Sequence, residues 1–305
     1  MSPQSSVIVT PARVLSRGGL GWGFLGVMAF SFTVPVTKVA LVGLSPLFIG
    51  SGRAVIAALL AAITLATLRA RRPTGVQWAR VAIVAGGVVV VGFPLLTSFA
   101  LTTAPAGHSA VVIGLLPAAT AVAAVLRGGE RPTRRFWIFA GSGAVAAMLF
   151  ASVQHGGLAP LAWSDLLLLG AVVAAAVGYA EGGLLARELG SWQTISWALV
   201  VAAPLMVALT ALSVVQQPPT AAIGSWLAFG YLGVVSMFLG FFAWYRGLAI
   251  GPIARVSQIQ LLQPVLSIVW AAFILRERLD WATVLGGLAV ILCAGLAVRT
   301  RLDRK

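Results

Sequence analysis

Residues 253–275 form an apolar segment in which polar side chains recur at helical spacing. Steps of three and four residues place side chains on one face of an α-helix. Pro264 interrupts the segment, and a proline inside a helix frees a carbonyl about one turn upstream. These groups can bind the ammonium or carboxylate of a small solute, or they can hydrogen-bond neighbouring helices; both interpretations stay open. The polar positions are Ser257, Gln260, Gln263 and Ser267.

A second group of candidates consists of deep aromatic rings and hydroxyls in other apolar segments. The rings of Trp244 and Tyr179 can stack on an apolar substituent or attract an ammonium through a cation–π contact. Packing is the alternative for the rings, and hydroxyls inside helices often bond their own backbone. We expect a solute site near Gln260, Gln263, Trp244 and Tyr179, with Ser257, Thr33 and Thr97 as further candidates.

Ionisable side chains inside the apolar segments are few, and each is a functional candidate because charge is costly in lipid. Lys38 lies about 27 Å along its predicted helix at 1.5 Å per residue, near the outer membrane face. Arg53 and His108 lie at a similar level. Together these three residues predict a positive outer vestibule suited to a carboxylate.

At the inner level, Glu181 is expected to pair with Arg246 or Arg255. The outer and inner sets would then act as two gates of unlike charge. His108 can also exchange a proton near neutral pH, which makes it a candidate for coupling. The alternatives are that the long side chains snorkel to the interface and that His108 forms a hydrogen bond at the headgroup boundary.

Several chemistries lack the residues they need. The sequence contains no G-x-x-x-x-G-K-[ST] motif for nucleotides and no H-E-x-x-H motif for zinc. A single cysteine, Cys293, excludes an internal disulfide and a multi-cysteine metal site. Ser51 has no nucleophile motif around it. We therefore expect a protein that is not an enzyme and holds no metal or cofactor.

The composition determines the environment of these residues. The chain has 305 residues, of which 60% are hydrophobic and 9% are charged, whereas soluble domains have about 25% charged residues. A soluble or disordered chain is therefore excluded. The net charge of +14 comes from 21 Lys and Arg against 7 Asp and Glu. Arginine-rich loops that orient a membrane protein explain this excess, so no nucleic-acid partner is expected.

An α-helix needs about 20 mostly apolar residues to span a bilayer, and windows of that length fill the chain. The runs are too long and too continuously apolar for barrel strands, so we predict an all-α integral membrane protein. The ten predicted spans are residues 20–41, 47–68, 79–101, 105–126, 135–153, 163–186, 192–213, 222–247, 253–275 and 281–298.

Loop charge predicts the orientation of these spans. Arginines gather after spans two, four and six and in the C-terminal tail, whereas the connections after spans one, three, five and seven contain no Lys or Arg. The loop after span nine is an exception, but acids accompany Arg276 and Arg278 there. We expect residues 1–19 and 299–305 to be cytoplasmic tails.

The second half of the chain repeats landmarks of the first at a constant offset of 147 residues, from 105 to 252, 117 to 264 and 130 to 277. The repeats, residues 20–155 and 160–298, hold five spans each. Because five is odd, the second copy enters the membrane from the opposite side, as in secondary transporters whose site lies at the repeat interface. The paired landmarks are Leu101 and Leu248, Pro105 and Pro252, Leu115 and Leu262, Pro117 and Pro264, and Glu130 and Glu277.

This pattern of five plus five spans, with Pro-(x)11-Pro-(x)12-Glu closing each half, resembles the drug/metabolite transporter superfamily in its EamA-like branch. The segment FILRERL at 273–279 is similar to the Phe-Leu-x-Glu-Arg/Lys segment of many members. Within the superfamily, the sequence is similar to exporters of aromatic and other neutral amino acids, the YddG type. The resemblance implies export across the inner membrane through a cavity lined by both halves.

These expectations combine into a secondary transporter that exports a neutral, aromatic amino acid by alternating access. The alternatives are export of another small metabolite or drug and, from a different class, a membrane-embedded lipid-modifying enzyme or scaffold. We expect the partners to be a small-molecule substrate and membrane lipid. We also expect a monomer, because the two halves already supply the symmetry needed to enclose a pore.

Overall fold

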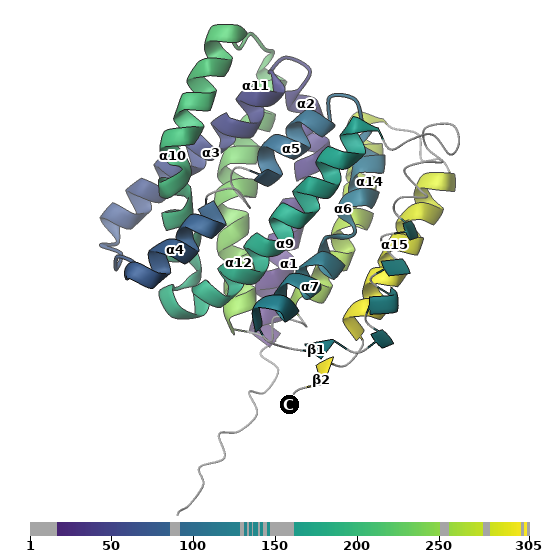
Figure 1. Ribbon diagram of the computed structural model, residues 1–305. Helices are drawn as coiled ribbons and strands as arrows, with labels where there is room; N and C mark the ends of the chain where they lie inside the picture. The colour runs from purple at the N-terminus through teal and green to yellow at the C-terminus, as the bar shows by residue number, and fades with distance from the viewer. Residues whose placement is uncertain are drawn as a thin grey trace, which may run out of the picture.

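The computed structural model describes residues 17–85, 92–128, 162–250, 256–276 and 281–299, with short pieces between 131 and 146 and at 302–303. Within these residues the chain is almost entirely helical, and the helices pack side by side in one bundle (Figure 1). In this view α10 and α3 lie at the left of the bundle and α15 lies at the right. The predicted all-helical class is confirmed.

The helices alternate between long segments and short ones that share a span. The first half contains α1 (Arg17–Ser31), α2 (Thr33–Ala40), α3 (Pro46–Thr67), α4 (Gly75–Ile83), α5 (Gly92–Ala100), α6 (Ala106–Ile113) and α7 (Leu116–Gly128). The second half contains α9 (Trp163–Leu189), α10 (Ser191–Gln216), α11 (Ile223–Tyr231), the π-helix η2 (Leu232–Leu239), α12 (Gly240–Ile250), the 3-10 helix η3 (Ser257–Leu261), α14 (Leu262–Leu275) and α15 (Trp281–Arg299).

In the described part of the chain, six helices are long and apolar enough to cross a membrane, so the protein is a multi-pass membrane protein. Each coincides with a predicted span to within a few residues. Two shorter apolar helices fall within the predicted ninth and tenth spans. The predicted fifth span lies largely outside the described residues, as do Glu130, Arg255 and Glu277. The six long helices are Gly18–Ala40, Pro46–Thr67, Ala106–Arg127, Trp163–Leu189, Ser191–Gln216 and Ile223–Ile250.

Prolines coincide with the breaks inside three spans. Pro35 has no N–H to donate to the carbonyl of Ser31, and the helix is interrupted at Phe32, between α1 and α2. Pro117 follows the break between α6 and α7, and Pro264 follows the change from η3 to α14. The same residue type therefore interrupts the fourth and ninth spans at matching positions of the two halves.

Helices from the two halves pack directly against each other. α3 packs along α10, α1 along α12, α5 and α7 against α9, and α6 against α14. Hydroxyl pairs join α3 to α10: Ser45 Oγ lies 2.8 Å from Ser213 Oγ, and Thr210 Oγ1 donates to Ser51 Oγ at 2.9 Å. Ser51 also donates to a backbone carbonyl of its own helix, so its hydroxyl holds helices together.

α1 and α12 approach so closely that glycine is required at their contact. A Cβ added to Gly26 would lie 2.9 Å from Cβ of Trp244, and one added to Gly247 would lie 2.8 Å from the backbone nitrogen of Gly23. Small residues allow helix backbones to meet in this way in membrane bundles. This contact fixes Trp244 against the wall of α1.

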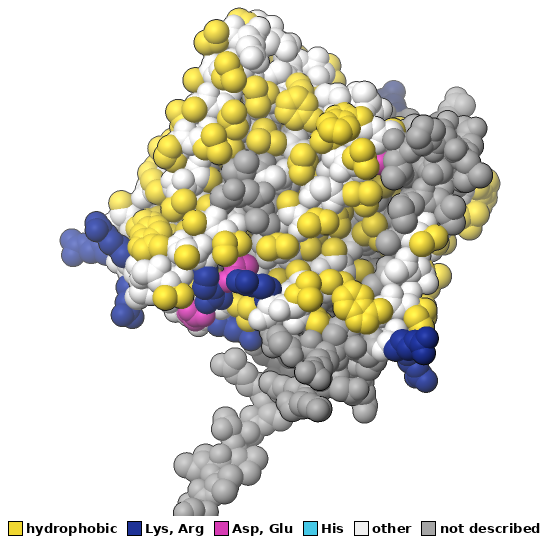
Figure 2. Space-filling model, in the orientation of Figure 1, with side chains coloured by type: hydrophobic (Ala, Val, Ile, Leu, Met, Phe, Trp, Pro, Cys, Tyr) yellow, Lys and Arg dark blue, Asp and Glu magenta, His cyan; other side chains and the backbone are white. Residues whose placement is uncertain are grey.

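Arginines gather at one end of the bundle, which we define by Arg80 of α4, Arg127 of α7 and the strand β1 (Arg131–Pro132) and name the arginine-rich end. β1 pairs antiparallel with β2 (Leu302–Asp303), so the segment after α7 lies beside the segment after α15. These two-residue strands are the departure from an all-helical chain among the described residues. Figure 2 shows most of the visible Lys and Arg side chains along the lower part of a mainly hydrophobic face.

Candidate functional site

A small cavity lies between the two halves of the bundle. Its volume is about 20 Å³, which is room for roughly one water molecule. α1, α2, α3 and α5 contribute to the wall from the first half, and α9, η2, α12 and α14 contribute from the second. The lining residues are Phe30, Thr33, Arg53, Phe93, Ala175, Tyr179, Ser236, Met237, Phe241 and Gln263.

Arg53 is the charged residue in this lining, and only 1% of it is exposed. Its Nη2 donates to Thr97 Oγ1 at 3.5 Å, which is longer than a typical hydrogen bond, and its Nε has no hydrogen-bond partner among the described residues. Of the ion pairs in the described part of the chain, none includes Arg53. Arg53 reaches the cavity from the eighth position of α3, and its predicted place in an outer vestibule stays a prediction.

The other polar groups of the wall come from both halves. Thr33 Oγ1 and Ser236 Oγ lie 2.7 Å apart across the boundary between α2 and η2. One hydroxyl donates to the other, so the second keeps its proton for another acceptor. Gln263 and Tyr179 also line the cavity and are almost fully buried. Thr33, Tyr179 and Gln263 therefore lie together, as expected for a solute site.

Aromatic rings form the apolar part of the wall. The ring centroids of Phe30 and Phe241 are 5.0 Å apart, and those of Tyr179 and Phe241 are 5.9 Å apart. Trp244 does not line the cavity, because it packs behind Phe30 and Tyr179 at centroid distances of 6.4 and 5.5 Å. Trp244 therefore lies behind the rings that line the cavity and not in its wall; a contact between Trp244 and a solute stays a prediction.

The polar residues predicted to share one face of the ninth span make different contacts. Ser267 Oγ donates to the Ser31 carbonyl at 2.7 Å, which is the acceptor that Pro35 leaves without a helical partner. Gln263 faces the cavity, whereas the side-chain amide of Gln260 is buried without a hydrogen-bond partner among the described residues. The side chain of Ser257 lies outside the described residues. Ser267 therefore forms a hydrogen bond between helices, whereas Gln263 lies in the cavity wall, where solute binding stays a prediction.

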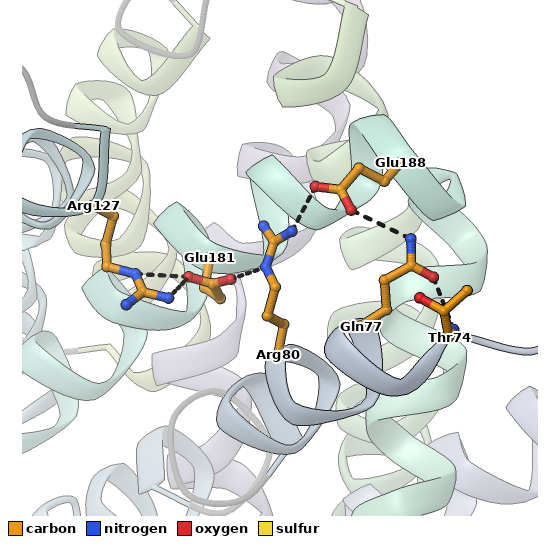
Figure 3. Close-up of polar contacts among 6 residues, drawn as sticks. All are labelled: Thr74, Gln77, Arg80, Arg127, Glu181 and Glu188. Atoms are coloured by element: carbon orange, nitrogen blue, oxygen red, sulfur yellow. Dashed lines mark hydrogen bonds and ion pairs between the residues drawn. The ribbon is translucent and has the colours of Figure 1, made fainter.

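At the arginine-rich end, the buried carboxylate of Glu181 joins three helices (Figure 3). One oxygen accepts from Arg80 Nε, and the other accepts from Arg127 Nε at 2.8 Å and from Arg127 Nη2. The expected partners were Arg246 and Arg255; among the described residues the partners are Arg80 and Arg127, so the expectation for Arg246 is wrong. Arg246 is exposed on α12, and Arg255 lies outside the described residues.

Polar contacts extend this cluster to the surface. Arg80 Nη1 donates to Glu188 Oε1 at 2.5 Å, and Gln77 Nε2 donates to Glu188 Oε2 at 3.3 Å. Gln77 Oε1 accepts from the backbone nitrogen of Thr74, which caps the start of α4. The ends of α4, α7 and α9 are therefore held together by one continuous set of charge-assisted bonds, as Figure 3 shows.

At the opposite end, His108 of α6 pairs with Asp165 of α9. His108 Nε2 lies 2.7 Å from Asp165 Oδ1, and both side chains are buried. Asp165 Oδ2 also accepts from the Ala162 nitrogen at 3.1 Å, which places the acid in the first turn of its helix. Asp165 was missed from the sequence, although it and His108 both lie near the outer start of a predicted span. Lys38 lies at this end too, half-buried in the last turn of α2.

Comparison with known proteins shows the family of the chain. The EamA-like transporter family matches the chain twice, at residues 17–152 and 162–299. The chain belongs to the EamA-like transporter family. It is therefore a membrane transporter, and its substrate is a small molecule. The two matched segments are the two halves between which the cavity lies.

Relatives cover nearly the whole chain. An "Uncharacterized transporter YdeK" of Bacillus subtilis (strain 168) is 45% identical over 281 residues, which are 92% of this chain and 97% of that protein. A "Probable terminal-alkyne amino-acid exporter" of Streptantibioticus cattleyicolor is 26% identical over 288 residues, 92% of this chain and 93% of that protein. A crystal structure of a protein with 19% identity has a TM-score of 0.65 and covers 95% of this chain and 100% of its own, so it shares the fold.

Proposed function

We propose that this transporter exports neutral amino acids, aromatic ones among them, across the inner membrane by alternating access. The observation that carries the proposal is the cavity, because both matched halves supply its wall and it holds donors, acceptors and aromatic rings together. Secondary transporters bind their substrate at such an interface between halves. A volume of about 20 Å³ is far smaller than an amino acid, so the cavity must widen before such a solute enters.

The pattern of helix packing supports an inverted repeat as the basis of this movement. If each span corresponds to the one five places later, then the contact of α1 with α12 becomes that of α9 with α5. Both contacts are present, and the remaining pairs α3 with α10 and α6 with α14 map onto themselves. The proline breaks in the fourth and ninth spans add a matching pair of discontinuous helices. Such breaks occur near the binding sites of transporters.

Two gates follow from the charged groups at the ends of the bundle. We assign the arginine-rich end to the cytoplasm, since Lys and Arg favour that side, and both chain termini with it. The cluster of Glu181 with Arg80 and Arg127 then closes the inner side in this state. His108 with Asp165 marks the outer level, where we place the coupling group. Opening toward the cytoplasm requires the Glu181 cluster to separate.

The substrate class rests on the lining and on one relative. The amino-acid exporter of Streptantibioticus cattleyicolor is a distant relative whose printed name specifies an amino-acid solute. Rings of Phe30, Tyr179 and Phe241 suit an apolar or aromatic side chain. Export of another small metabolite or drug is the alternative, because rings and amides also bind such molecules. We propose a monomer as the working unit.

Proteoliposomes containing the purified chain test this function directly. A panel of labelled amino acids would be loaded, and efflux would be followed with and without a pH gradient. We expect flux of neutral and aromatic amino acids that depends on this chain alone. Gln263→Ala should reduce that flux because it removes the amide of the cavity wall. Absence of flux for every amino acid, alongside movement of other metabolites, would favour the alternative substrate class.

A further inference from the structure

We propose that Arg53 is the receptor for a carboxylate of the substrate and that this carboxylate, rather than an ammonium, is the group the site requires. The inference rests on the proposed function and narrows its substrate class. It begins from the position of one guanidinium, which lines the cavity between the halves and is 1% exposed. Arginine carries five N–H donors in a planar fork that matches a carboxylate.

The surroundings of Arg53 leave this fork largely unused. Its one hydrogen bond among the described residues is the 3.5 Å contact with Thr97 Oγ1, and Nε has no partner. The Thr97 hydroxyl is already committed to its own helix, because it donates to the Phe93 carbonyl at 2.7 Å. A buried cation without an anion is strongly unfavourable. A substrate carboxylate would supply the missing charge.

Additional donors lie in the same cavity wall. The Thr33 and Ser236 hydroxyls share one hydrogen bond of 2.7 Å, which leaves one hydroxyl proton available. Gln263 brings an amide N–H₂ from α14. A carboxylate that bridges Arg53 and these groups would contact both halves of the transporter. Binding would then be sensitive to the relative position of the halves, as alternating access requires.

The cavity offers much less to an ammonium. None of its ten lining residues is acidic. An amino group would find the Gln263 carbonyl oxygen and the faces of aromatic rings, which are weaker partners than a carboxylate. A zwitterion beside Arg53 leaves one net positive charge in the closed cavity, whereas a monoanion leaves none. Carboxylates whose amine is blocked or absent should therefore bind at least as tightly as the amino acid.

The apolar part of the cavity wall should select the group attached to the carboxylate. Phe30, Phe93 and Phe241 line the cavity together with Met237, whose unbranched side chain adapts to different shapes. A phenyl or alkyl group attached near the carboxylate would replace contacts among these rings. The structure thus assigns to the site small apolar carboxylates, of which aromatic amino acids are one kind.

A ligand series on the purified full-length chain separates the carboxylate from the ammonium. The probes are L-phenylalanine, L-phenylalaninamide, N-acetyl-L-phenylalanine and 3-phenylpropionate, tested by direct binding and by inhibition of phenylalanine flux in proteoliposomes. We expect N-acetylphenylalanine and phenylpropionate to compete at least as well as phenylalanine. Phenylalaninamide, which keeps the ammonium and lacks the carboxylate, should bind about 100-fold more weakly or not at all.

Variants of Arg53 complete the test. Arg53→Gln should weaken binding of the carboxylates about 100-fold and remove the preference over the amide, whereas Arg53→Lys should keep that preference with about 10-fold weaker binding. The matched control is Arg72→Gln, which removes an exposed guanidinium from the loop between α3 and α4. If Arg53→Gln fails to fold, the ligand series on the unaltered chain and the Lys variant still decide the question.

The outcomes distinguish this inference from the function on which it rests. Equal binding of phenylalanine and its amide, or an Arg53→Gln variant within twofold of the unaltered chain, would overturn the carboxylate site while leaving transport intact. Failure of all four probes to bind or move would contradict the proposed substrate class itself and the carboxylate site with it.

Discussion

Arginines occupy two contrasting environments in this bundle. At the arginine-rich end, Arg80 and Arg127 meet the carboxylate of Glu181, and their own side chains are 20% and 48% exposed. Arg53 is 1% exposed, reaches one distant hydroxyl and has no ion pair among the described residues. The first environment satisfies its charges within the protein. The second leaves a charge unsatisfied at the place where a solute would bind.

The Glu181 cluster stabilises the structure, whereas Arg53 is proposed to bind a ligand. Charge-assisted bonds among α4, α7 and α9 stabilise the arginine-rich end in the absence of any substrate. Arg53 contributes unfavourable energy to the same state, because its desolvation is not offset by an anion. Stability and binding should therefore respond in opposite ways to substitutions in the two regions.

The largest expected effect is on stability at the arginine-rich end. Glu181→Gln leaves two arginines facing a neutral amide and should lower the free energy of unfolding by about 3 kcal/mol. The measurement is thermal or denaturant unfolding of the purified chain in detergent. The matched control is Glu188→Gln, whose carboxylate is 46% exposed and should contribute less than about 1 kcal/mol. Equal losses for the two variants would mean that burial of Glu181 adds nothing.

A change of opposite sign is expected in the cavity. Arg53→Met replaces an uncompensated cation by an apolar side chain and should raise the free energy of unfolding by about 2 kcal/mol while flux is lost. Unfolding and proteoliposome flux measured on the same preparation check both parts. A loss of stability like that of Glu181→Gln would show that Arg53 is satisfied in the free protein and would remove the contrast between the two regions.

The smallest effect concerns the neutral bond between the halves. Ser267→Ala leaves the Ser31 carbonyl without its donor and should lower the free energy of unfolding by about 1 kcal/mol, with substrate affinity unchanged. Ser196→Ala is the control, because that hydroxyl is buried with no hydrogen-bond partner among the described residues. The control removes a buried hydroxyl that has no partner to lose, so it should not lower the free energy of unfolding. A drop in substrate affinity for Ser267→Ala would instead assign Ser267 to the binding site.

The sequence was a sufficient guide to features that depend on one helix at a time. Apolar length gives the spans, since this effect acts within a single segment. Position along a helix also gives depth, which correctly set Glu181 near one end and His108 near the other. Tyr179 and Gln263 were expected at the solute site, and both line the cavity.

Features that depend on direction around a helix, or on which helices are neighbours, could not be predicted. Depth alone did not show that Arg53 points to the cavity or that Trp244 lies behind Phe30. The partners of Glu181 were sought among buried charges, whereas Arg80 and Arg127 reach it from helix ends that border the loops. Long arginine side chains can span that difference in depth.

The hydrogen bond from Ser267 to the Ser31 carbonyl has a consequence for motion. That carbonyl is available because residue 35 is proline, and the hydroxyl that takes it belongs to the other half of the molecule. The break in the first span and the position of α14 are thus joined by a hydrogen bond between the two halves. We expect a tilt of α14 to pull on the backbone at Ser31, so that movement of one half reshapes the other.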